Sequence, residues 1–167
     1  MKTNLTKYTM LALCALFGFS LSGISNAQAP SDDKAAAAKA AKAAKVKFKW
    51  GKNLKTAKKQ AEETGLPIVI LFTGTKWCGY CMKLEDQVLK KKEFKKGMDG
   101  VAICVKFEYK SSAALGKSKE AKEFGIRGVP SMVIIDAEGN VLGRAGYNAG
   151  LTPEGLIETI KNASGKN

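Results

Sequence analysis

Two cysteines three positions apart, Cys78 and Cys81, are the residues whose type and spacing point most directly to chemistry. The pair is compatible with redox activity, with an inert structural disulfide, or with metal binding and transfer. A structural zinc site is disfavoured because the 167-residue chain has no histidine and only four cysteines, one of them in a segment that we expect to be removed. A disulfide across so short a loop removes little chain entropy, which argues against a purely structural role. We therefore predict a redox pair, with no metal and no cofactor beyond the cysteines themselves.

The residues around the pair predict different environments for the two sulfurs. An apolar run over residues 67–72 predicts a buried strand, and helical periodicity resumes near Tyr80, so we expect Cys78 at the exposed start of a helix. Cys81 lies one turn later, in phase with Leu84, and is expected on the inward face. A helix N-terminus favours a thiolate and lowers a cysteine pKa from about 8.5 to about 3.5–7.5. Cys78 is therefore predicted to attack a substrate disulfide, and Cys81 to resolve the mixed disulfide that results.

A third cysteine, Cys104, calls for a different interpretation. It lies within residues 101–105, an apolar run that predicts another buried strand. A cysteine in such a place behaves as a small hydrophobic residue, so we expect Cys104 in the core and without a catalytic role. The lack of histidine also excludes nucleophilic catalysis by a Cys–His pair.

The apolar pattern predicts the elements that must hold these residues. It indicates an α/β order in which a βαβ unit is followed by a β-hairpin and a covering helix. Apolar residues alternate with lysines over residues 46–50 and predict a short edge strand or an extended segment. Residues 111–117 predict a polar loop. Phe94 is expected to be an apolar anchor within the basic residues 90–96. We expect helices over about residues 54–64, 80–89, 119–124 and 153–160, and strands over 67–72, 101–105, 132–135 and 141–147.

The N-terminal residues predict export. Lysines near the start precede the mostly apolar residues 9–21, and small residues follow at 25–27, with an alternative cleavage site at 27–29. This pattern is typical of a signal peptide. An apolar run of this length is too short for a spanning helix, which needs about 20 residues. Cys14 lacks the preceding small residue that lipidation requires. We expect residues 1–27 to be removed as a signal peptide, and the mature protein to be periplasmic or secreted.

The next segment, residues 28–45, is rich in lysine and alanine. Because it has no apolar stripe to bury, we expect a solvated tether, partly helical at best, before a single domain over residues 46–167. The formal net charge of the chain is +13. Nucleic-acid binding is not predicted, because the basic stretches contain no motif rich in aromatic residues. Solubility, or peripheral association with an anionic envelope, accounts for the charge.

Three segments together resemble the thioredoxin superfamily, over about residues 48–163. They are Trp-Cys-Gly-Tyr-Cys at 77–81, Phe-Gly-Ile-Arg-Gly-Val-Pro at 124–130, and the hairpin from Gly139 to Tyr147. The resemblance is strongest to exported bacterial thioredoxin-like proteins. It implies an α/β fold with a central mixed sheet of about four to five strands flanked by helices. It also implies a cis Pro130 that faces the cysteines, and it implies Trp77, Val129 and Pro130 as substrate-binding residues, the Val129 backbone pairing with an extended substrate.

The sequence departs from the thioredoxins proper at two places. Phe72 stands where those proteins have a buried aspartate that helps to deprotonate the second cysteine, and phenylalanine cannot accept a proton. Glu85, Asp86 and Glu108 are alternative acids, and water is a further one, and the sequence does not choose among them. The loop at residues 110–118 is also longer, which we expect to influence substrate choice.

These observations predict an exported thiol–disulfide oxidoreductase that acts on protein disulfides. We expect a protein-disulfide reductase rather than an oxidase or isomerase, a membrane-bound electron donor, and a monomer, because no segment resembles the dimerisation domain of periplasmic isomerases. The alternative is a non-catalytic thioredoxin-like module that binds peptides. The reduction potential of the cysteine couple separates a reductant, near about −270 mV, from an oxidant, near about −120 mV.

Overall fold

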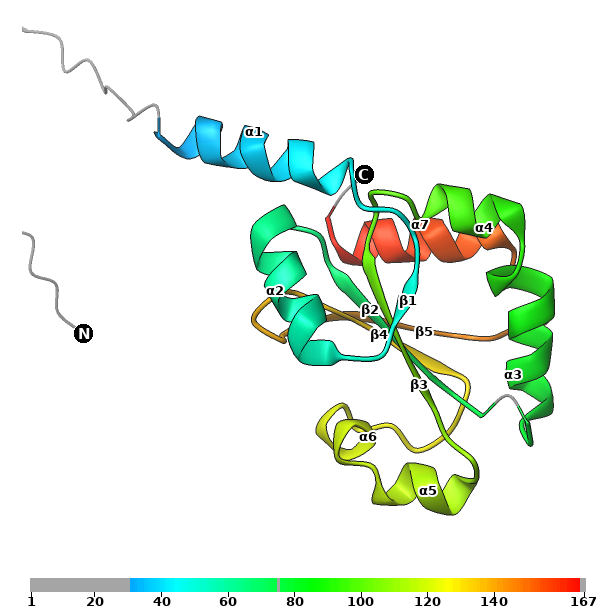
Figure 1. The fold of residues 1–167 in the computed structure, drawn as a ribbon. Coiled ribbons are helices and arrows are strands. Elements are labelled where there is room, and N and C mark those ends of the chain that lie inside the picture. Colours follow the sequence, from blue (N-terminus) through cyan, green and yellow to red (C-terminus); the bar gives the residue numbers. More distant parts are fainter. Residues whose placement is uncertain (1–30, 75, 166–167) are drawn as a thin grey trace, which may run out of the picture.

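Five strands form one mixed sheet in the computed structural model, which describes residues 31–74 and 76–165 (Figure 1). Their order across the sheet is β1-β3-β2-β4-β5. β3 runs parallel to β1 and β2, whereas β4 runs antiparallel to β2 and β5. The fold predicted from the sequence, a mixed sheet flanked by helices, is therefore confirmed. The strands are β1 (Trp50–Gly51), β2 (Ile68–Thr73), β3 (Ile103–Glu108), β4 (Ser131–Ile135) and β5 (Val141–Gly146).

The position of β2 in the centre of the sheet explains why its sequence is apolar without alternation. Every residue of β2 is buried, because helices cover both faces of the sheet at this strand. Ile68 and Phe72 point into one core cluster, and Val69 and Leu71 point into the other. Alternate residues of one strand therefore fill the two halves of the core.

Helices form a layer on each face of the sheet. On one face α2 (Leu54–Thr64), α5 (Ser112–Lys117) and α6 (Lys119–Glu123) contribute to the first core cluster. On the other face lie α3 (Gly79–Leu84), the π-helical turn that continues it (Glu85–Leu89), α4 (Lys92–Gly97) and α7 (Pro153–Ala163). The last helix begins as predicted, with the Thr152 hydroxyl oxygen accepting the Gly155 N–H at 3.1 Å.

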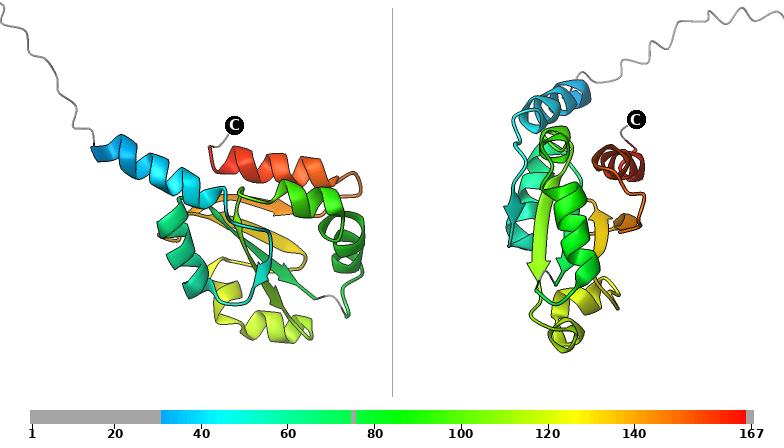
Figure 2. Two further views of the ribbon diagram at one scale, coloured as in Figure 1. Left: turned by 45° about the horizontal axis from the view of Figure 1, so that its top comes forward. Right: turned by 90° about the vertical axis from the view of Figure 1, so that its right-hand side faces the viewer.

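The lysine- and alanine-rich segment is more helical than expected. It forms α1 (Ser31–Ala43), which extends away from the sheet in both views of Figure 2. Alanine and lysine favour a helix, and the C-terminal end of α1 is fixed to the domain because Ala43 is buried there. The backbone N–H of Gly100 donates to the Val46 carbonyl at 2.9 Å just beyond it. The division of the chain at residues 45 and 46 stays a prediction.

Two further expectations about local structure were wrong. Residues 111–117 are not a polar loop, because the Ser111 hydroxyl accepts the Ala114 N–H and Leu115 is buried, and these contacts support α5. The strand expected over residues 101–105 is β3, which continues beyond Val105 to Glu108. Its partner β1 is two residues long, so the outer edge of β3 is open beyond Val105 and tolerates polar side chains.

The extended segment that leads into β1 and the burial of Phe94 were confirmed. The helix expected over residues 80–89 is an α-helix only as far as Leu84 and then continues as a π-helical turn. None of the helices in residues 31–74 and 76–165 is long and apolar enough to cross a bilayer. The proposed signal peptide, residues 1–27, lies outside the described residues.

Candidate active site

The ends of three neighbouring strands bring the sequence motifs together. Phe72 of β2 lies opposite Ser131 of β4, and Thr73 lies opposite Glu108 of β3. Because β2 and β3 are parallel and β4 is antiparallel, the residues that follow β2 and β3 meet those that precede β4. The cysteine motif therefore lies beside the Val129–Pro130 peptide, although the two are far apart in sequence.

Cys78 and Cys81 form a disulfide, with their Cα atoms 5.2 Å apart. Cys78 is the N-cap of α3, and its sulfur accepts the Cys81 backbone N–H at 3.1 Å. The side chains differ in burial in the predicted order, since Cys78 is 7% exposed and Cys81 1%. Cys78 is nevertheless less exposed than we expected. Its sulfur lies 3.5 Å from the Val129 carbonyl oxygen, and this contact covers one side of it.

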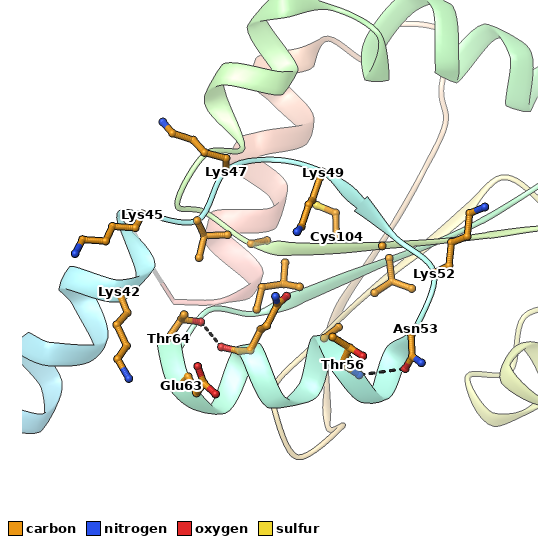
Figure 3. Close-up of a pocket in the computed structure, with 17 residues that line it drawn as sticks. Lys42, Lys45, Lys47, Lys49, Lys52, Asn53, Thr56, Glu63, Thr64 and Cys104 are labelled. Atoms are coloured by element: carbon orange, nitrogen blue, oxygen red, sulfur yellow. Dashed lines mark hydrogen bonds between the residues drawn. The ribbon is translucent and has the colours of Figure 1, made fainter.

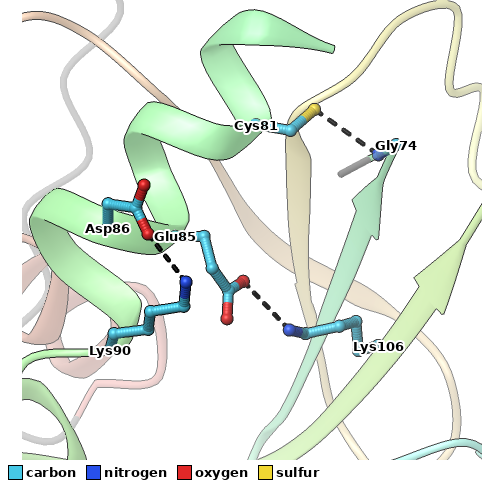
Figure 4. A network of polar contacts seen from close by, with 6 residues as sticks. All are labelled: Gly74, Cys81, Glu85, Asp86, Lys90 and Lys106. Carbon is cyan, nitrogen blue, oxygen red and sulfur yellow. Dashed lines mark hydrogen bonds and ion pairs between the residues drawn. The ribbon is translucent and has the colours of Figure 1, made fainter. Parts of the chain in front are cut away.

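A tight turn before α3 fixes the direction of both sulfurs. The Gly74 carbonyl accepts the backbone N–H groups of Trp77, at 3.2 Å, and of Cys78, at 2.8 Å. The Gly74 N–H donates to the Cys81 sulfur at 3.5 Å (Figure 4). A Cβ on residue 74 would lie 2.5–2.7 Å from the Trp77 ring, so glycine is required for this packing.

Trp77 is anchored to another part of the chain. Its indole N–H donates to the Tyr109 carbonyl at 2.7 Å, and 39% of the residue is exposed. The Tyr109 hydroxyl lies 2.8 Å from the Ser118 hydroxyl, which also caps α6 by accepting the Ala121 N–H. Burial raises the pKa of the Tyr109 hydroxyl, an effect that the Ser118 hydrogen bond partly offsets. The cysteine motif is thus coupled to the segment that we expected to influence substrate choice.

The Val129–Pro130 peptide is cis, as the resemblance implied. Trp77 and Val129 line the same pocket of about 500 Å³, together with Leu115 from α5 and Ile126. Pro130 lies directly before β4 and outside this lining. The structure therefore brings Trp77 and Val129 to one concave surface beside Cys78. The substrate-binding roles of all three residues stay predictions.

The alternative acids lie around the helix that carries Cys81. Glu85 accepts from Lys106 at 3.0 Å, and less than a fifth of either side chain is exposed. Asp86 is turned toward Lys90, which it contacts at 2.7 Å, and away from Cys81 (Figure 4). The hydrogen bond from Lys90 to Asp86 raises the pKa of Lys90. All three acids line one pocket of about 420 Å³.

The position of Phe72 excludes an acid at that place in the fold. Its side chain is fully buried, and its ring is stacked on Tyr109 at 6.5 Å between centroids. Phe107 and Phe124 pack at 5.7 and 6.2 Å from it. An aromatic cluster therefore occupies the position at which the thioredoxins proper have a buried aspartate.

Cys104 lies where the sequence predicted it. It is 4% exposed on β3, and burial raises the pKa of its thiol to about 12. At neutral pH it is an uncharged core thiol. Sequence reasoning missed two residues of the site, Gly74 and Tyr109, because both act chiefly through backbone atoms, which leave no side-chain signal. A glycine immediately after a buried strand was the one available indication.

Comparisons with known proteins agree with this geometry. A family model described as a thioredoxin-like domain matches residues 54–162. Disulfide bond reductase DsbH of Chlamydia pneumoniae is 38% identical over 90 residues, which cover 50% of this chain and 54% of that protein. Thioredoxin-related protein DsbJ of Chlamydia pneumoniae is 32% identical over 122 residues, which cover 66% of this chain and 34% of that protein.

The matched region thus spans about half the length of the first curated relative and a third of the second. A solved structure of a DsbH oxidoreductase is similar over 74% of this chain and 89% of its own length. It has a TM-score of 0.62 and 28% sequence identity.

Proposed function

Because this chain belongs to the family of thioredoxin-like domains, we propose that it is a thiol–disulfide oxidoreductase that reduces disulfides of exported proteins. The observation that carries the proposal is the position of Cys78. It caps α3, forms a disulfide with the more deeply buried Cys81, and lies 3.5 Å from the Val129 carbonyl. Similarity to a protein named disulfide bond reductase supports the direction of the reaction.

The reaction begins from the reduced pair. The Cys81 N–H that donates to the Cys78 sulfur stabilises a thiolate at that atom. The thiolate attacks one sulfur of a substrate disulfide and forms a mixed disulfide, and the other substrate sulfur leaves as a thiolate that takes a proton from water.

Resolution follows within the motif. Cys81 gives its proton to water, and its thiolate attacks the Cys78 sulfur. The bond between Cys78 and the substrate breaks, and the remaining substrate sulfur leaves as a thiolate that takes a proton from water. Two electrons have then passed to the substrate, and the enzyme is in the disulfide form of this structure. A dithiol protein must return two electrons to the pair and become oxidised itself. We propose a membrane-bound donor for this step.

The proposed location outside the cytoplasm rests on the N-terminal sequence. Removal of residues 1–27 would release a monomeric periplasmic or secreted domain. The mass and N-terminal sequence of the exported protein test this part of the proposal. A mature chain that starts at Gln28 supports it, and a chain that retains the apolar residues 9–21 contradicts it.

Reduction of insulin by dithiothreitol tests the catalytic assignment. The unchanged protein should accelerate the reaction, and Cys78→Ser should reduce the rate to that of dithiothreitol alone. Cys81→Ser should instead accumulate the mixed disulfide, because the resolving thiol is lost. Cys104→Ala is the matched control and should keep its activity, because Cys104 lies in the core. Turnover that survives Cys78→Ser would falsify the mechanism.

The reduction potential tests the direction. We expect a value near about −270 mV, as in reducing thioredoxins, and a value near about −120 mV would make the protein an oxidant.

A second candidate function is peptide binding without turnover. The pocket of about 500 Å³ beside Cys78, with walls from Leu115 and Ile126, favours it as a place for an apolar side chain. A module of this kind would bind an unfolded polypeptide equally well before and after Cys78→Ser, and the unchanged protein would not accelerate insulin reduction.

A further inference from the structure

A second pocket, of about 690 Å³, lies at the opposite end of β3 from the cysteine pair. The end of α1, the extended segment before β1, helix α2 and the first residues of β3 form its walls (Figure 3). It shares no lining residue with the pocket of Trp77 and Val129. The residues that line it include five lysines, all exposed: Lys42, Lys45, Lys47, Lys49 and Lys52.

The positive charge here is not balanced locally. Residues 34–60 contain ten lysines and no aspartate or glutamate. Within the part of the chain that the structure describes, Lys47 is the one lysine of the five with an ion pair, to Asp99 at 3.1 Å. Of the acids in residues 31–74 and 76–165, Glu63 alone lines the pocket. Because these five lysines line one pocket, an anion at this place would attract several ammonium groups at once.

The shape of the cluster indicates a broad anionic surface and not a single small ion. In Figure 3 the side chains of Lys42, Lys45, Lys47 and Lys52 extend from the rim in different directions. All ten basic residues in this region are lysines, whereas sites for defined carboxylate or phosphate groups favour the planar fork of arginine. Lysine ammonium groups act as point charges, and clusters of them attract the anionic lipids of a membrane surface.

The floor of the pocket narrows the class of ligand. Aliphatic residues contribute to it, among them Val46, Ile103 and Val105. Among the residues that the structure describes, none that lines the pocket is aromatic, so these residues offer no platform on which a nucleic-acid base could stack. A charged rim over an aliphatic floor matches a phospholipid, in which the charged phosphate and the glycerol backbone are followed by apolar acyl chains.

We propose that this lysine-rimmed pocket binds the headgroups of anionic phospholipids and holds the domain against a membrane surface. Because the pocket lies beside the start of β3 and the cysteines lie beyond its end, a bound domain keeps its disulfide accessible to partners. The proposal is independent of the direction of electron transfer.

Co-sedimentation of the full chain with lipid vesicles tests it. Binding to vesicles that contain phosphatidylglycerol should exceed binding to neutral phosphatidylcholine vesicles and should fall with added salt. The neutral vesicles report any insertion of the apolar residues 9–21. Replacement of Lys45, Lys49 and Lys52 by glutamine should weaken the anionic component about 100-fold, at about fivefold for each lysine near the surface.

The matched control removes the same charge elsewhere. Lys92→Gln, Lys95→Gln and Lys96→Gln are exposed substitutions on α4, on the other face of the sheet, and should cost several-fold less affinity. Equal losses for the two triple variants would overturn the proposal, because net charge alone would then explain binding.

Acetylation of lysines in the unchanged protein provides a second measurement that does not depend on any variant. Anionic vesicles should protect Lys45, Lys49 and Lys52 from the reagent more than they protect the α4 lysines. Equal protection at both places contradicts the proposal. So does equal protection of the three pocket lysines by inorganic pyrophosphate or by a DNA duplex, since the site would then be one for free phosphate or for nucleic acid.

Discussion

The indole N–H of Trp77 donates a 2.7 Å hydrogen bond to the backbone carbonyl of Tyr109, which joins the residue before Cys78 to the residue that follows β3. Tyr109 is itself fixed through its hydroxyl to Ser118 at the start of α6. The position of the exposed tryptophan beside Cys78 therefore depends on a contact with a segment 32 residues away in sequence.

Trp77→Phe keeps an aromatic ring at this position and removes the hydrogen bond. We expect a loss of about 1 kcal/mol in the free energy of unfolding, measured in urea, because the Tyr109 carbonyl loses its donor. Insulin reduction should slow roughly 3- to 10-fold, since the ring is less well positioned. Trp50→Phe is the control and should leave activity unchanged. Equal activity of both variants would show that the anchor has no role in turnover.

Gly74→Ala places a methyl group against the Trp77 ring. The added Cβ would lie 2.5–2.7 Å from the ring, so Trp77 or the turn must move, at a cost of about 1–3 kcal/mol in unfolding free energy. Gly116→Ala, in α5, meets nothing within 4 Å and should be neutral or slightly stabilising. Urea unfolding of both variants checks the pair. A loss for Gly74→Ala no larger than that for Gly116→Ala contradicts the packing argument.

Cys104 predicts a loss of stability at alkaline pH. Its folded pKa of about 12 lies above the unfolded value of about 8.5, so the folded state favours the neutral thiol. The contribution is complete below about pH 8.5 and is lost as the pH rises from there through 12. Between pH 8 and pH 10 the unfolding free energy of the unchanged protein should fall by about 1.5–2 kcal/mol more than that of Cys104→Ala.

The measurement is urea unfolding of both proteins at the two pH values. It is best made in a Cys78→Ser/Cys81→Ser background, which prevents thiol exchange between Cys104 and this cysteine pair. Titration of lysine and tyrosine residues is common to both proteins and cancels in the difference. Parallel pH profiles would mean that Cys104 is not buried as a neutral thiol.

Asp99 fixes the extended segment that forms one wall of the lysine-rimmed pocket. Its carboxylate accepts the Phe48 backbone N–H at 2.8 Å and the Lys47 ammonium at 3.1 Å. The hydrogen bond from the Phe48 N–H is the main reason why the pKa of Asp99 is lowered, and the Lys47 contact lowers it further. The stabilisation is therefore present above the unfolded pKa of about 3.9 and is lost as the pH falls through the lower folded value.

We expect Asp99→Asn to accelerate hydrogen exchange of the Phe48 amide at neutral pH. Asp86→Asn removes an exposed partner of Lys90 instead and should leave that amide unchanged. The difference between Asp99→Asn and the unchanged protein should vanish in acid, below the folded pKa of Asp99. Unchanged exchange at Phe48 in neutral solution would rule out the proposed role of the carboxylate.

The amino-acid sequence determined the elements whose signals are local. The apolar run of β2, the Thr152 cap of α7 and the core position of Cys104 follow from side-chain type and spacing alone. The same holds for the unequal burial of Cys78 and Cys81, because one begins a helix and the other lies a turn inside it.

Only the tertiary structure decided which distant segments meet. Helix α5 is six residues long, too short for a periodic pattern, and forms because Leu115 finds a place in the core. The contact of Trp77 with Tyr109 uses a backbone carbonyl, which leaves no side-chain signal in the sequence. The pocket beneath the lysines forms only where the segment that carries them packs against α2 and β3. Local spacing specifies which side chains turn inward, whereas contacts between segments depend on the strand register that the packed core selects.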